Sequence, residues 1–364
     1  MPHDNFLYKI ALNYIPNVGC INAKKLVAFC GSAKGVFEAT RKELSRIPGI
    51  GEKRIRDIMS KSALRKAEHE LTLVNKQDIQ LYYYLDEDYP IRLKQYPDAP
   101  IILYHRGNTD INSSRTVSIV GTRQATARGL GICREFVENL KSYECLIISG
   151  LAYGIDSCAH KTALENQIPT LAVVGTGLAS IYPAANRKLA HSMLKNGGVL
   201  SEFPMNTKAD RENFPRRNRI IAGLSDVILV IESGLRGGSV ITAKYGNDYA
   251  KDVFAIPGRI SDPLSEGCNQ LIKTHQAHLC SSVDDISYIM GWDHQHNPKQ
   301  LKIEFELEKE EQLIIDLIRS KNEISLELIH YESGISFSAL SSLLLGLEFK
   351  GLVTSIPGKK YILT

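Results

Sequence analysis

The sequence lacks paired cysteines. Its seven cysteines form no Cys-x-x-Cys and are odd in number, which argues against a zinc ribbon and against a disulfide framework. No stretch approaches eighteen uncharged apolar residues, and Met1-Pro2-His3-Asp4 opens the chain without the basic start and apolar run of a signal peptide. We therefore expect a cytoplasmic protein with reduced thiols, no metal site and no membrane span.

Nucleotide-binding motifs are also missing. No Gly-Lys-Ser/Thr occurs, and no Gly-x-Gly-x-x-Gly is followed by an acidic ribose-binding residue, so P-loop and dinucleotide functions are disfavoured. Asp156, Cys158 and His160 share one helical stretch, but positions two apart face different directions and no further ligands accompany them. We favour a helix-capping Asp156, a hydrogen-bonded structural His160, no cofactor and no enzymatic activity.

Charge is distributed unevenly over the 364 residues, although the net charge is only +4. Residues 1–75 carry 13 Lys and Arg against 7 Asp and Glu, a net +6, whereas residues 301–364 carry 7 against 10, a net −3. A basic module suits a phosphate-bearing partner, because each neutralised phosphate releases counterions. Solvated helix faces would produce the same imbalance.

An internal repeat occupies the basic N-terminal part. Ile15-Pro16-Asn17-Val18-Gly19 recurs 32 residues later as Ile47-Pro48-Gly49-Ile50-Gly51, which predicts two helix-hairpin-helix units in residues 1–75. Such a turn exposes the first amides of the next helix to a DNA phosphate, and Gly49, Gly51, Lys53 and Arg54 are the candidate contacts. Asn17 tolerates the left-handed turn that Gly49 makes in the second copy. The alternative is a helical packing module whose glycines only make turns.

Residues 76–292 alternate short β-branched runs with helical stretches, the pattern of a Rossmann-like, doubly wound, mostly parallel sheet in the α/β class. The expected strands are 116–120, 146–149, 170–174, 198–201, 226–231 and 253–256, and the expected helices are 127–140, 156–164, 184–194, 214–222 and 240–250. Ligands bind beyond the carboxyl ends of such strands, where glycine turns begin at Gly121, Gly150 and Gly175.

Positive charge gathers after these turns, as expected for a pocket that binds a phosphate backbone. Arg123 follows the first turn, Lys188 opens a helix, Arg217 and Arg219 stand in Phe214–Arg219, and Lys244 follows a turn that contains Gly238. For any single arginine the alternative is a solvated position on the rim of the sheet.

Several ordered motifs resemble those of the DNA-processing protein A family, also called DprA or Smf. They are Gly121-Thr122-Arg123, the segment from Ser149 to His160 and the segment from Phe214 to Leu224, with further similar segments at 237–243, 252–258 and 267–272. The resemblance spans roughly residues 89–280. It implies a protein that binds single-stranded DNA without chemistry, protects incoming DNA in natural transformation and helps load a RecA-type recombinase. It also implies a homodimer, with residues 271–279 as the expected contact.

The resemblance implies site residues as well. Arg123, Arg217 and Arg219 would contact phosphates, with Lys188 and Lys244 as weaker candidates, and we expect the arginines to be at least partly exposed. Gly121, Gly150, Gly175 and Gly238 would let the strand approach the backbone.

A nucleotide- or nucleoside-monophosphate-binding hydrolase of the lysine decarboxylase-like Rossmann type is the competing function. Such proteins carry Pro-Gly-Gly-x-Gly-Thr-x-x-Glu, and the comparable turn, residues 235–243, lacks the acidic residue.

The C-terminal part has the order of a winged helix. After a polar linker at 293–303, the module at 304–364 shows helices near 312–318, 326–331 and 337–348, then strands near 352–354 and 360–363. The third helix carries no cation near its start, whereas base reading normally needs Arg, Lys, Asn or Gln there. We expect a protein-contact or regulatory role for this module.

Overall fold

The computed structural model describes residues 3–292, 307–321, 323–350, 352–356 and 358–363. The chain divides into two compact units, Met1–Gln295 and His296–Thr364. Among the described residues, no helix is both long and apolar enough to cross a lipid bilayer.

The described part of the first unit opens with a group of helices: α1 (His3–Asn13), α2 (Cys20–Cys30), α3 (Ala33–Glu38), α4 (Arg41–Leu44), α5 (Glu52–Met59) and α6 (Ser62–Lys76). The two turns of the repeat lie before α2 and before α5. Asn17 and Gly49 have positive φ angles of 58° and 84°, so asparagine makes the left-handed turn as predicted. Gly19 and Gly51 are the N-caps of α2 and α5, without a side-chain cap.

A nine-stranded sheet forms the centre of this unit in the described residues, in the order β1-β2-β6-β5-β4-β3-β7-β8-β9. The strands are β1 (Gln80–Tyr83), β2 (Ile102–Gly107), β3 (Thr116–Gly121), β4 (Leu146–Ser149), β5 (Thr170–Val173), β6 (Gly197–Ser201), β7 (Val227–Ile231), β8 (Asp252–Ala255) and β9 (His278–Leu279). From β6 to β9 all neighbours are parallel, and only β1 and β2 add antiparallel pairings. The prediction of a mostly parallel, doubly wound sheet is confirmed.

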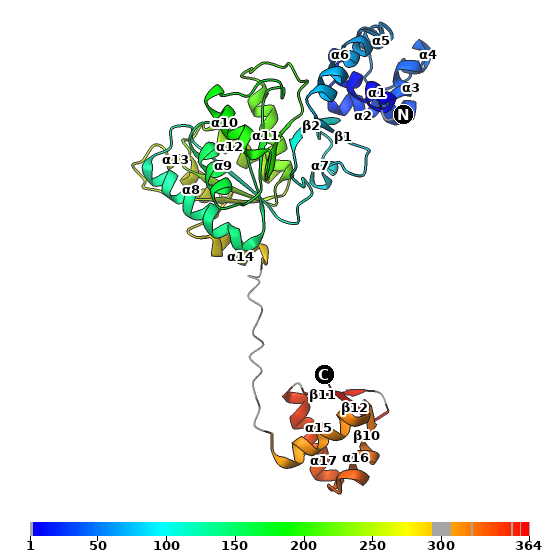
Figure 1. Cartoon of the computed structure of the whole chain (residues 1–364), viewed down its shortest axis with the longest axis vertical. Coiled ribbons are helices and arrows are strands. Elements are labelled where there is room, and N and C mark those ends of the chain that lie inside the picture. The colour runs from blue at the N-terminus through cyan, green and yellow to red at the C-terminus, as the bar shows by residue number, and fades with distance from the viewer. Residues whose placement is uncertain (1–2, 293–306, 322, 351, 357, 364) are drawn as a thin grey trace. The chain divides into compact units, whose positions relative to one another are not determined.

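Helices cover both faces of the sheet, as Figure 1 shows. The helices are α7 (Ile91–Lys94), α8 (Ala127–Asn139), α9 (Ile155–Glu165), α10 (Arg187–Met193), α11 (Asn213–Leu224), α12 (Gly238–Asp248), α13 (Glu266–Lys273) and α14 (Val283–Met290). One core cluster joins the strands to α8, α9 and α14, and another joins them to α7, α11, α12 and α13. Alternate residues of β3 and β7 enter the two clusters, as a strand buried on both sides requires.

The N-terminal helices share a hydrophobic core with the sheet edge at β1 and β2. Polar contacts reinforce this packing. Lys9 Nζ donates to the Asp86 carboxylate at 2.8 and 2.9 Å, and buried Glu70 accepts from Tyr14 Oη at 2.9 Å and from the Met205 amide at 2.6 Å. The helical module is therefore anchored on the α/β part.

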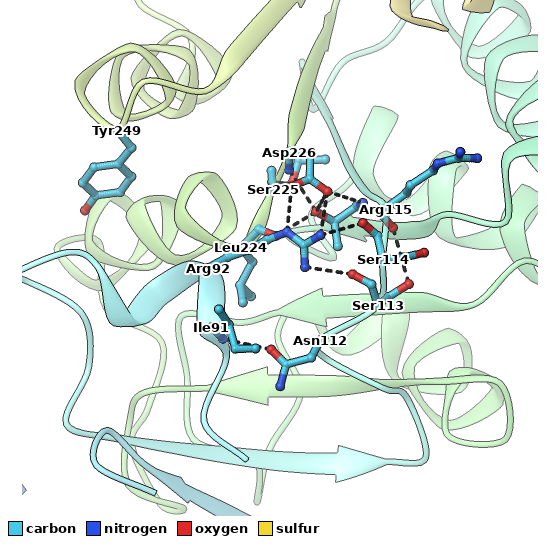
Figure 2. A network of polar contacts seen from close by, with 12 residues as sticks. Ile91, Arg92, Asn112, Ser113, Ser114, Arg115, Leu224, Ser225, Asp226 and Tyr249 are labelled. Carbon is cyan, nitrogen blue, oxygen red and sulfur yellow. Dashed lines mark hydrogen bonds and ion pairs between the residues drawn. The ribbon is translucent and has the colours of Figure 1, made fainter. Parts of the chain in front are cut away.

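A second anchor lies at the amino ends of β3 and β7 (Figure 2). The Arg92 guanidinium donates to both Asp226 carboxylate oxygens, at 2.7 and 2.8 Å, and to the Ser113 and Ser114 carbonyls. Asp226 also accepts from the Thr116 amide at 2.9 Å. This bidentate pair ties α7 to the starts of two central strands and leaves their carboxyl ends free.

The second unit is described from residue 307 with the gaps given above. It contains α15 (Lys309–Lys321), β10 (Ile324–Ser325), α16 (Leu326–Ser333), α17 (Phe337–Phe349), β11 (Val353–Ile356) and β12 (Lys360–Leu363), with the strand order β10-β12-β11. The predicted helices and strands of the winged helix are confirmed in this order. The predicted linker at 293–303 lies outside the described residues.

Candidate nucleic-acid interface

A cavity of about 890 Å³ lies beyond the carboxyl ends of β3 and β7. These strands are neighbours, yet the chain runs outward from β3 through β4, β5 and β6, and outward in the other direction from β7 through β8 and β9. The strand order reverses between them, and open α/β sheets bind ligands in the crevice at such a reversal. The cavity thus occupies the edge at which the sequence predicts a binding site.

Three exposed arginines line this cavity from three different segments. Arg123 follows β3, Arg211 precedes α11, and Arg236 lies in the turn before α12. Within the described part of the chain, none of the three is paired with an acidic side chain. Unpaired guanidiniums on a concave surface attract an anion, and several of them suit a row of phosphates.

Aromatic rings border the same cavity. The rings of Tyr182 and Phe214 lie 5.7 Å apart between centroids, and the Arg123 guanidinium carbon lies 5.4 Å from the centroid of Phe214. Tyr182 is about half exposed. Rings beside cations are the combination with which proteins hold unstacked bases and their phosphates together.

Arg217 forms the buried floor of the cavity. Its Nη1 donates to the Val173 carbonyl at 3.0 Å, whereas its buried Nε has no protein acceptor. Burial lowers the pKa of Arg217 to about 10, an effect that the Asp156 carboxylate opposes and Arg123 increases. The guanidinium therefore stays cationic at neutral pH.

Asp156 faces Arg217 from the start of α9. Its Oδ2 accepts from the Ala152 amide at 3.3 Å, and burial raises the pKa of its carboxyl while the Arg217 charge opposes that rise. The prediction that Asp156 caps α9 is wrong, because the N-cap is Gly154. Asp156 instead fixes the Gly150–Gly154 turn and balances part of the charge of Arg217.

His160 is a structural residue, as predicted. Its Nδ1 lies 2.7 Å from Thr170 Oγ1, and both side chains are fully buried. Burial, and then the charge of Arg217, lowers the pKa of His160 to about 3, so the ring is neutral. The described residues contain no cluster of His, Cys, Asp and Glu able to hold a metal ion.

The four glycines of the predicted site differ in their surroundings. A Cβ at Gly121 would lie 2.0 Å from the Ile231 carbonyl oxygen, one at Gly150 would lie 1.6 Å from Arg217 Nη1, and one at Gly175 would lie 3.1 Å from the Phe214 ring. Only Gly238 of the four meets nothing within 4 Å. We expected glycine at positions 121, 150 and 175 to let a DNA strand approach the backbone. That reason is wrong for these three positions, because the protein's own groups lie where a side chain would be.

Arg219 lies away from the cavity. It forms a buried ion pair with Glu202, and its Nη1 donates to the Asp98 carbonyl at 2.7 Å. The prediction that Arg217 and Arg219 are partly exposed is wrong, since only 4% and 8% of these residues are accessible. Both lie on α11, which the sheet, α7 and α12 cover, and buried acceptors compensate their charge.

The remaining predicted cations are scattered. Lys188 on α10 and Lys244 on α12 are exposed, and neither lines the cavity. Arg211 and Arg236 were missed by sequence reasoning. Arg236 lies in a glycine-rich turn that precedes a helix, and this sequence pattern could have indicated an anion-binding residue. Arg211 lies in a loop that has no such pattern.

The second predicted site lies at the N-terminus of α5. Gly49 and Gly51 have open space around them, and Lys53 is exposed. Arg54 is engaged otherwise, because its Nε donates to the Asn17 carbonyl at 2.9 Å and its Nη1 to the Gly49 carbonyl at 2.6 Å. Arg54 therefore clamps the two hairpin turns together.

Known families and structures match all three parts of the chain. The family model described as DNA recombination-mediator protein A matches residues 80–291, the helix-hairpin-helix motif matches residues 32–61, and the DprA winged helix domain matches residues 298–359. Protein Smf of Synechocystis sp. is 36% identical over 276 residues, which cover 75% of this chain and 69% of that protein.

Two solved structures resemble the fold. DNA processing protein A from Streptococcus pneumoniae has a TM-score of 0.68 and 32% identity, covering 79% of this chain and 98% of the other. The structure titled for the single-stranded DNA binding mode of DNA processing protein A from Helicobacter pylori has a TM-score of 0.54 and 27% identity, covering 59% and 97%. With its central 212 residues matched by the family model, the chain belongs to the DNA recombination-mediator protein A family, also called DprA or Smf.

Proposed function

We propose that this protein binds single-stranded DNA in the cavity beyond β3 and β7 and performs no chemistry on it. The observation that carries the proposal is the convergence of Arg123, Arg211 and Arg236, all unpaired, around the buried Arg217. Phosphate oxygens supply acceptors for the three exposed guanidiniums, and the buried charge of Arg217 adds to their attraction for an anion. The solved relative from Helicobacter pylori, whose title names a single-stranded DNA binding mode, supports the same partner.

The aromatic border favours a single strand over a duplex. Tyr182 and Phe214 offer ring faces beside the cations, and bases can stack on them only when they are not paired inside a double helix. Gly238, the N-terminal residue of α12, leaves backbone amides accessible to a phosphate. We expect sequence-tolerant binding, because the charges of these groups attract the phosphate backbone and their ring faces can stack on any base.

The N-terminal hairpins are a second, weaker DNA contact in this proposal. Gly49, Gly51 and Lys53 present amides and one cation at the start of α5, while Arg54 holds the two turns in place. Paired turns of this kind suit a phosphate backbone. We assign them to the double-stranded part of a DNA that has both forms.

Family membership supports the cellular role. In this proposal the protein protects incoming DNA and helps load a RecA-type recombinase during natural transformation, in the cytoplasm and as a homodimer. Within the predicted contact at residues 271–279, Leu271 is buried in the core, but Leu279 is 53% exposed on β9, the edge strand of the sheet. An exposed edge strand pairs readily with a second copy, so Leu279→Glu should shift the protein towards monomer in size-exclusion chromatography.

Binding assays with three ligands test the proposed function. We expect fluorescence anisotropy to show tighter binding to a single-stranded oligonucleotide than to its duplex, without Mg²⁺ or ATP. Nucleoside monophosphates should neither compete nor raise the melting temperature. Saturable binding of a monophosphate, followed by its hydrolysis, would instead support the competing hydrolase function.

A further inference from the structure

Two thiols meet at the interface between α8 and α9. Cys133 is fully buried on α8 and Cys158 lies on α9; the two helices pack against each other, and both side chains belong to one core cluster. Nearby carbonyls hold both sulfurs, since Cys133 Sγ lies 3.8 Å from the Ile155 oxygen and Cys158 Sγ lies 3.6 Å from the Leu130 oxygen. By contrast, Cys145 Sγ donates within its own segment, to the Leu140 carbonyl at 3.7 Å.

A separate cavity of about 290 Å³ gives small solutes access to Cys158. Arg134 and Lys161 line it, together with Thr162 and Glu165. Cys133 does not line it. Cys158 is therefore accessible to small solutes, close to the cations Arg134 and Lys161, whereas Cys133 is buried away from this cavity.

The surroundings of the two sulfurs differ in their effect on acidity. Contact with Cys133 lowers the pKa of the Cys158 thiol, and Thr162 and Arg134 lower it further against the effect of burial. The same contact, together with burial, raises the pKa of Cys133. The thiolate is the nucleophile in thiol chemistry, and cationic neighbours favour it.

We propose that Cys158 is a peroxide-reactive thiol and that Cys133 is its resolving partner. The Cys158 thiolate attacks one oxygen of hydrogen peroxide, the O–O bond breaks, hydroxide leaves, and sulfur is oxidised to sulfenic acid while peroxide is reduced. The Cys133 sulfur then attacks the sulfenic sulfur, its proton and the hydroxyl leave as water, and a disulfide forms. A cellular dithiol reverses this by exchange, as is usual for redox-sensing disulfides in a reducing compartment.

The disulfide would link the two helices close to the DNA cavity. Each sulfur already reaches a backbone carbonyl of the opposite helix, so a small movement of the side chains is enough to bring the two sulfurs to bonding distance. Cys158 lies two residues after Asp156, which faces Arg217 in the cavity wall. The proposed modification site therefore shares α9 with the DNA cavity, but the two sites have no lining residue in common and the modification does not depend on DNA binding.

Peptide mapping of the peroxide-treated full-length chain tests the proposal. Trypsin leaves Cys133 in Gly129–Arg134, but leaves Cys145 and Cys158 together in residues 142–161. The Cys145→Ser variant is therefore the matched background, because in it any cross-link between these two peptides identifies Cys133–Cys158. We expect this cross-link, a mass loss of two hydrogens, and full reversal by dithiothreitol.

Single variants separate the two roles. Cys133→Ser should accumulate a sulfenic acid at Cys158 that dimedone traps, and Arg134→Gln should slow the oxidation severalfold at pH 7. Cys158→Ser should lose the cross-link. If the Cys145→Ser protein reacts with peroxide at other cysteines first and yields no linked peptide, the proposal is wrong, whatever the folding of the other variants.

Discussion

The guanidinium of Arg217 occupies the space that a side chain at Gly150 would fill. A Cβ at residue 150 would lie 1.6 Å from Nη1 and 2.5 Å from Cζ of Arg217. Arg217 is buried and held by the Val173 carbonyl, so it has little room to move aside. The glycine after β4 and the arginine on α11 therefore form one unit, and the floor of the cavity depends on both.

Gly150→Ala should displace Arg217 and weaken binding of single-stranded DNA. Overpacking a tight site costs about 1–3 kcal/mol, so the free energy of unfolding should fall by that order in urea titrations. Gly131→Ala is the matched control, because a Cβ at residue 131 on α8 meets nothing within 4 Å. This control should keep its DNA affinity, and its stability should be unchanged or slightly higher. Equal behaviour of the two variants would contradict the coupling.

Arg219→Ala should damage stability much more than DNA binding. The change leaves the Glu202 carboxylate buried without its partner, and breaking a buried pair in this way costs about 3–5 kcal/mol. Denaturant unfolding should show the loss. In protein that is still folded at low temperature, the salt dependence of DNA binding should be unchanged. A shallower salt dependence would place Arg219 among the phosphate contacts after all.

Acid should destabilise the protein through its buried histidines. Burial and Arg217 lower the pKa of His160 to about 3, and burial lowers that of His105 to about 4. Below the ordinary histidine pKa of about 6.5, these two histidines bind protons in the unfolded chain but stay neutral in the folded chain. The free energy of unfolding therefore falls as the pH drops from about 6.5. Urea titrations between pH 7.5 and 5 should show this slope. His160→Asn should flatten it, whereas His191→Asn, at an exposed position, should not.

Deleting the winged-helix module, residues 301–364, should leave most of the affinity for single-stranded DNA intact. Its third helix, α17, contains no Lys or Arg, and the segment 301–364 is acidic. We expect less than a tenfold change in anisotropy titrations of the chain ending at residue 300. Removing residues 1–75 is a poorer experiment, since those helices share a core with β1 and β2. Lys53→Ala tests the hairpins instead, and it should weaken binding to duplex-containing DNA only.

The strands could be predicted because short β-branched runs between glycine turns are an unambiguous pattern. The expected strand at 116–120 became Thr116–Gly121, and that at 146–149 was found unchanged. β1, β2 and β9 were missed. β9 has only two residues, and β2 carries His105 and Arg106, whose polarity hides the strand even though His105 is buried.

The site was only partly predictable, because burial depends on distant partners. Arg123 was found from the glycine turn that ends β3. Arg219 was misplaced because its acceptors are Glu202 and the Asp98 carbonyl, 17 and 121 residues away. Sequence spacing gives no sign of such a pairing, and a lone arginine is mostly exposed. Arg211 was missed because the loop before α11 follows no periodic pattern.

The salt dependence of single-stranded DNA binding by the double variant Arg123→Ala, Arg236→Ala tests the central claim most directly. Both residues are exposed and unpaired, so stability should change by less than about 0.5 kcal/mol. Lys141→Ala, Lys195→Ala is the matched control, since it removes the same charge from exposed positions before β4 and β6, at the other end of the strands. Each lost phosphate contact changes the slope of log K against log salt by about 0.7. We predict a slope shallower by about 1.4 and an affinity lower by about tenfold or more for the cavity variant, for any base sequence. Equal slopes and affinities for the cavity variant, the control and the parent protein would contradict the claim that this cavity binds DNA.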